Sequence, residues 1–174
     1  TAPQQLPDGT LHSELSGKVT FVPHPTETFT LPADTFVPQT TDKRFLVRVF
    51  FGQLPYAVTQ MQLDWLCYTF GGKCAVVGAE RIMKQQPKHV SGNKKQMPTG
   101  CLHAYASAEA VETLSSRMHK TLLIDDTGVW HATDAAEKAA LKAYCDSMKM
   151  DKSRRPVSRP YDGVSVERAT SSYH

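Results

Sequence analysis

The segment 46–56 constrains the fold more than any other part of the sequence. It reads LVRVFFGQLPY, a β-branched and aromatic run closed by Gly52 and Pro55, and this pattern predicts a strand that runs into a turn. Side chains alternate along a strand, so Arg48 and Phe50 are expected to share one face. An aromatic ring beside an arginine on that face indicates a stacking surface. The same run also fits a strand that is buried on both faces.

Length and composition narrow the classes of protein. The 174 residues are 40% apolar and 21% charged, which fits one globular domain with flanking segments. No apolar run approaches the ~20 residues needed to cross a bilayer, so we expect no membrane contact. The four cysteines have no C-x-x-C spacing, which favours reduced thiols in an intracellular protein: Cys67, Cys74, Cys101 and Cys145.

Motifs of catalysis and of cofactor binding are absent from the sequence. It contains no Walker loop, no H-E-x-x-H and no G-x-S-x-G. We therefore predict that the protein is not an enzyme and holds neither a metal nor a cofactor.

Charge divides the chain into an acidic leader and a basic body. Residues 1–42 carry one basic and five acidic residues, and the remainder carries 19 basic and 12 acidic residues. The net charges are −4 and +7, which is a modest indication of polyanion binding. We divide the chain into an extended Pro/Thr-rich arm (1–42), a domain (43–149) and a basic tail (150–174).

The body shows alternating strand and helix signals. After the first strand, Thr59 is a plausible cap for a helix over 60–70, and 73–83 predicts a second strand. A lysine-rich loop over 84–99 leads to a third strand at 100–106, and Ser107 caps a second helix. Two short strands, 122–124 and 129–132, are joined by a tight turn. A helix follows from 135 to about 149, and the tail shows no core-forming pattern.

This order, β-α-β-β-α-β with one added C-terminal helix, predicts an α+β fold of the ferredoxin-like split βαβ type. Such a fold has a four-stranded antiparallel sheet with two helices on one face. The other face of the sheet must be used or covered. The apolar residues of the N-terminal arm suggest that this arm lies along a surface, either its own or a partner's.

With this order in place, the segment 49–54 (VFFGQL) resembles the first-strand motif of the RNA recognition motif (RRM) family. The resemblance covers residues 45–133. The long lysine loop that ends at Pro98-Thr99-Gly100 is most similar to the cytoplasmic-polyadenylation-element-binding subgroup and to kinetoplastid RRM proteins. The resemblance implies a sheet face that stacks bases of single-stranded RNA.

The third-strand motif of that family, K/R-G-F/Y-G/A-F-V-x-F/Y, is degenerate here. Without a gap, Cys101 and His103 replace both stacking aromatics, and Tyr105 shares their face. A shift by one residue would instead make Tyr105 the final buried aromatic residue. Trp130 can face either the sheet surface near Phe50 or the core, and its neighbour Val129 favours the sheet surface for Trp130.

Two functions fit these patterns. The first is an RNA-binding module or a component of a ribonucleoprotein, whose RNA contacts are Arg48, Phe50, Cys101, His103, Tyr105, Trp130, Lys94, Lys95, Arg154 and Arg155. The second is an RRM-fold subunit that interacts with protein, with its sheet face covered by a partner, by its own arm or by its C-terminal helix. Missing aromatics on the third strand favour the second function, and the basic body favours the first.

Overall fold

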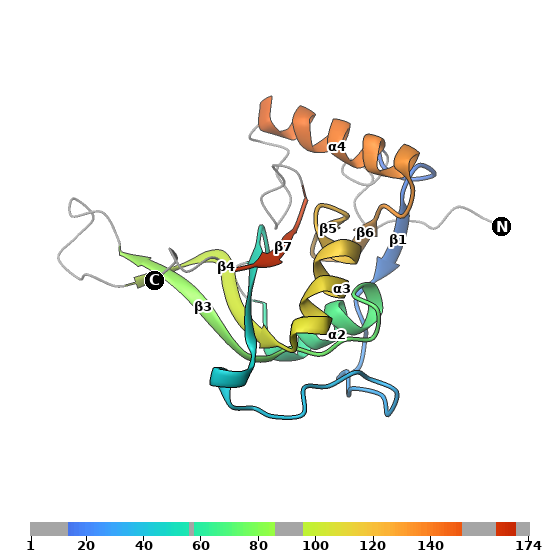
Figure 1. The fold of residues 1–174 in the computed structure, drawn as a ribbon. Helices are drawn as coiled ribbons and strands as arrows, with labels where there is room; N and C mark the ends of the chain where they lie inside the picture. Colours follow the sequence, from blue (N-terminus) through green and yellow to red (C-terminus); the bar gives the residue numbers. More distant parts are fainter. Residues whose placement is uncertain (1–13, 56–57, 86–95, 151–162, 170–174) are drawn as a thin grey trace.

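The computed structural model describes residues 14–55, 58–85, 96–150 and 163–169 (Figure 1). The chain is α+β, with two antiparallel sheets. The elements in order are β1 (Thr20–Pro23), the 3-10 helix η1 (Lys43–Phe45), β2 (Val47–Gly52), α2 (Gln60–Phe70), β3 (Val77–Gln85), β4 (Gln96–Ala106), α3 (Ala108–Met118), β5 (Leu122–Ile124), β6 (Gly128–His131), α4 (Ala135–Met150) and β7 (Ser165–Arg168).

The larger sheet has the strand order β3-β4-β2-β7, and every neighbouring pair is antiparallel. Helices α2 and α3 pack on one face of it, which makes the arrangement compatible with a ferredoxin-like fold. Strand β2 and helices α2 and α3 lie where the sequence predicts the first strand and the first two helices. The second strand starts at Val77, later than predicted, and the third starts earlier, at Gln96.

The fourth strand of this sheet is not the one that the sequence predicted. Strand β7 pairs with β2, whereas the predicted strands 122–124 and 129–132 form β5 and β6 of a separate three-stranded sheet. The interpretation of 150–174 as a tail without core-forming residues was therefore wrong for its described part. Val164 and Val166 are 1% and 0% exposed.

Helix caps explain why the two predicted helices begin where they do. Thr59 accepts a hydrogen bond from the backbone of Gln62, and the Gln62 side chain accepts one from the backbone of Thr59, which is a capping box. Ser107 accepts a hydrogen bond from the backbone N–H of Ala110 at the start of α3. These local signals are the ones that the sequence displays most plainly.

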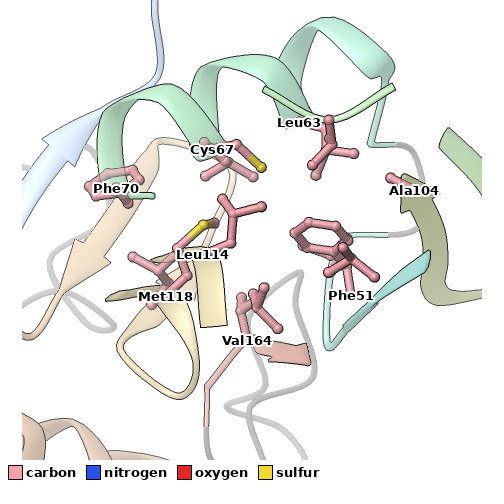
Figure 2. Packing of buried hydrophobic residues seen from close by; sticks show 14 of the residues in the cluster. Phe51, Leu63, Cys67, Phe70, Ala104, Leu114, Met118 and Val164 are labelled. Carbon is pink, nitrogen blue, oxygen red and sulfur yellow. The ribbon is translucent and has the colours of Figure 1, made fainter. Parts of the chain in front are cut away.

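The first hydrophobic core lies between the larger sheet and helices α2 and α3 (Figure 2). Phe51 of β2 and Ala104 of β4 point toward the helices, where Leu63 of α2 and Leu114 of α3 lie. Val164 packs in the same cluster, beside Met118. All six side chains are fully or almost fully buried. One face of the sheet is thereby committed to packing, and its side chains are removed from any binding role.

The smaller sheet has the order β1-β6-β5, and its strands β5 and β6 are buried on both faces. Leu122 and Ile124 of β5 join the first core, while Leu123 joins a second core with α4 and the N-terminal segment. Leu15 is 1% exposed in this second core. The described part of the N-terminal arm therefore packs on the chain's own body, through β1 and the turn before it.

We expect Val166→Ala to lower the free energy of unfolding by about 1–3 kcal/mol, because it leaves a cavity between β7 and helix α3. Arg168→Ala is the matched control, since Arg168 is exposed on the same strand, and it should change stability by less than about 0.5 kcal/mol. Urea denaturation measures both. Equal effects of the two substitutions would contradict the placement of β7 in the core.

Candidate functional site

The second face of the larger sheet carries five of the ten predicted binding residues, and we call it the outer face. It is formed by Arg48 and Phe50 of β2 and by Cys101, His103 and Tyr105 of β4, all of which are half-buried. Their strand neighbours point the other way: Val49, Phe51, Leu102, Ala104 and Ala106 are buried in the first core. The alternation places Tyr105 on the same face as His103, which is the arrangement predicted without a one-residue shift.

The strand register brings the outer-face residues together in pairs. Phe50 lies opposite His103, and Arg48 lies opposite Tyr105. The Phe50 and His103 rings meet edge to face, with centroids 6.0 Å apart and an interplanar angle of 62°. Phe50 belongs to neither hydrophobic core.

Gly52 permits the position of the Phe50 ring. A Cβ atom at residue 52 would lie 2.8 Å from Cε2 of Phe50, so the ring lies along the bare backbone two residues further on the strand. A larger residue at 52 would push the ring away from the sheet. Gly52 therefore determines where the Phe50 ring lies on the outer face.

The Tyr105 ring makes a cation–π contact with a lysine. The Lys43 ammonium lies 4.7 Å from the centroid of the Tyr105 ring. The same ammonium forms an ion pair with the carboxylate of Glu80 on β3, and hydrogen bonding to that carboxylate raises the pKa of Lys43. Neither Lys43 nor Glu80 was predicted as a site residue, because no local motif marks a contact between residues 37 positions apart.

The surroundings of His103 disfavour its charged form. Burial lowers its pKa, the Arg48 guanidinium lowers it further, and the Glu80 carboxylate acts in the opposite direction. The buried Nε2 atom of His103 has no hydrogen-bond partner in the described ranges. The imidazole therefore presents an uncharged ring beside Phe50 near neutral pH.

The prediction that Trp130 faces the outer face was wrong. Trp130 is 2% exposed and lies in the second core, where its ring is 4.7 Å from that of Phe21, centroid to centroid. Val129, on the opposite face of the same strand, is in the first core. Because β6 is buried on both faces, neither residue is available at the surface, and Trp130 is not beside Phe50.

Asp125 holds the turn before Trp130. Its Oδ1 accepts hydrogen bonds from the backbone N–H groups of Thr127 and Gly128 and from the Thr127 hydroxyl. Its Oδ2 accepts one from Nε1 of Trp130, at 3.1 Å. A carboxylate that is only 5% exposed is thereby satisfied by four donors and stabilises the hairpin of β5 and β6.

The other predicted contacts are not placed by the structure. Lys94, Lys95, Arg154 and Arg155 lie outside the described residues. In the described part, no group of three His, Cys, Asp or Glu residues is arranged to hold a metal ion. No described helix is long and apolar enough to cross a membrane.

Comparison with protein-family models and with curated proteins gives no match.

Asp125→Ala should lower the free energy of unfolding by about 2–4 kcal/mol, because it leaves several buried donors without an acceptor. Asp126→Ala, at the exposed neighbouring position, is the control and should have little effect. Urea denaturation followed by tryptophan fluorescence measures both. A loss below about 1 kcal/mol at Asp125 would show that water replaces the carboxylate.

Arg48→Met should raise the pKa of His103, because it removes a nearby cation that disfavours the imidazolium form. The pKa of His131, which burial lowers in the smaller sheet, serves as an internal reference and should not move. Titration of the two rings by NMR gives both values. An unchanged pKa at His103 would mean that the guanidinium points away from the imidazole.

Proposed function

We propose that this chain is an RRM-like module that binds single-stranded RNA through its outer face. The observation that carries the proposal is the edge-to-face pair of Phe50 and His103 on the two central strands of the larger sheet. Tyr105 continues the row along β4, and Arg48 stands between Phe50 and the start of β2. Rings in a row beside a guanidinium are the arrangement that stacks successive bases and holds a phosphate.

The order of elements supports a ferredoxin-like fold of the RRM type. We infer that β2, β3, β4 and β7 are the four strands of that fold, and that α2 and α3 are its two helices. The hairpin β5-β6 and helix α4 are then an insertion between the second helix and the fourth strand. In this interpretation β7 is the fourth strand in place of the one predicted from the sequence, and the other three strands are those that the sequence predicts.

The base-stacking energy available on this face predicts that it binds RNA weakly. Base stacking on an aromatic side chain contributes ~1–3 kcal/mol per base. Phe50 supplies one full platform, while an imidazole at 103 and a thiol at Cys101 replace the other two. We therefore expect an affinity in the micromolar range, to which sequence-independent attraction by the basic body adds.

The second candidate function is protein interaction, and a groove lined by three exposed, large apolar side chains favours it. The groove has a volume of about 490 Å³ and lies between the N-terminal segment, η1 and the start of α3. Phe36, Val37 and Phe45 line it and are 44%, 52% and 72% exposed. Such a cluster is typical of protein contacts rather than of solvated surface.

Phe50→Ala should weaken binding to random single-stranded RNA by about 5- to 100-fold, because one stacking platform is lost. Phe45→Ala removes an exposed ring in the groove and should leave RNA affinity unchanged. Fluorescence anisotropy of a labelled oligonucleotide measures both, with circular dichroism as the check of folding. Absence of micromolar binding, or equal affinity of wild type and Phe50→Ala, would contradict the proposal and leave the groove as the better-supported surface.

A further inference from the structure

Lys43 reaches the outer face from η1, just before β2. Its ammonium lies over the Tyr105 ring and is paired with Glu80, whose strand register places it opposite His103. Residues directly opposite one another on antiparallel strands share a face, so Glu80 belongs to the same surface as the rings. Lysine, glutamate and tyrosine therefore meet at one end of the platform.

The backbone provides room for this contact. Gly78 of β3 has φ +64°, and a Cβ atom there would lie 3.4 Å from Cδ1 of Tyr105 and 3.5 Å from Cε of Lys43. The lysine chain and the tyrosine ring thus approach each other beside a residue without a side chain. At the other end of the contact, η1 is fixed by Asp42, whose side chain accepts a hydrogen bond from the backbone N–H of Arg44.

An ammonium over a ring excludes a base from that side of the ring. The side chains of Lys43 and Glu80 are 50% and 52% exposed. Exposed ion pairs are weak, and a polyanion can therefore displace the lysine from Glu80 at low cost.

Building on the RNA-binding function proposed above, we propose that Tyr105 is a gated base site. Lys43 covers the ring in the free protein, and Glu80 holds the lysine there. When RNA binds, a base replaces the ammonium on Tyr105, and the released Lys43 pairs with a phosphate. Glu80 then sets the affinity of the face, because its carboxylate retains the lysine and repels the RNA backbone.

The experiment compares wild type with Glu80→Gln for binding of random single-stranded RNA at several salt concentrations. Glu80→Gln should tighten binding about fivefold or more, because the Tyr105 platform becomes accessible. The dependence of log K on log salt should keep the wild-type slope, because Lys43 pairs with a phosphate in both complexes.

The matched control is Asp34→Asn. Asp34 pairs with Lys73 in an ion pair of similar exposure, 52% and 58%. Lys73 follows α2, which packs on the opposite face of the sheet, so this substitution makes the same change of charge and releases a lysine away from the rings. Tighter binding in Glu80→Gln but not in Asp34→Asn supports the gate.

The possible failures are distinguishable. If wild type binds RNA and loses affinity on Phe50→Ala, but Glu80→Gln behaves like Asp34→Asn, the gate is wrong and the RNA-binding function stands. If neither wild type nor Glu80→Gln binds, both proposals fall. If Glu80→Gln binds RNA and wild type does not, the RNA-binding function proposed for the native face is wrong, and so is a gate that RNA opens.

Discussion

The structure depends on one short segment that joins its two sheets. Val164 exchanges backbone hydrogen bonds of 2.8 Å with Lys120 and Leu122 beside β5, and the next residues pair with β2 as β7. The side chains of Val164 and Val166 fill the first core from this edge. Without the segment, β2 would have an unpaired edge and the two sheets would lose these backbone hydrogen bonds.

The same core explains why the outer face presents rings and charge. Period-two alternation in β2 and β4 sends small and aliphatic side chains to the helices, and every second residue emerges on the other side. The rings of Phe50 and His103 are thus positioned by packing that takes place beneath them. A rigid sheet with a committed back face is a suitable support for binding residues, because their backbone positions do not depend on a ligand.

The features of the fold that the sequence predicts are those that depend on local signals. Thr59 and Ser107 predict where two helices begin. The alternation of residues around Phe50 predicts which side chains of β2 lie on each face of the sheet. The sequence alone could not predict β7. A strand of four residues has no periodic pattern long enough to recognise, and its partner strand lies more than a hundred positions away. Trp130 was misplaced although a signal existed: Leu122-Leu123-Ile124 has no alternation, which indicates a strand buried on both faces. The contact between Lys43 and Glu80 depends on tertiary structure alone.

The position of β7 in the chain has a consequence for synthesis on the ribosome. Strands β2, β3 and β4 and both core helices are complete once residue 118 has emerged, yet the edge of β2 has no partner until residue 168 follows. During that interval the nascent sheet exposes a strand with two adjacent phenylalanines, a feature that favours association with other chains. The residues of β5, β6 and α4, which lie between α3 and β7 in the chain, thus lengthen the period in which a chaperone would protect this protein.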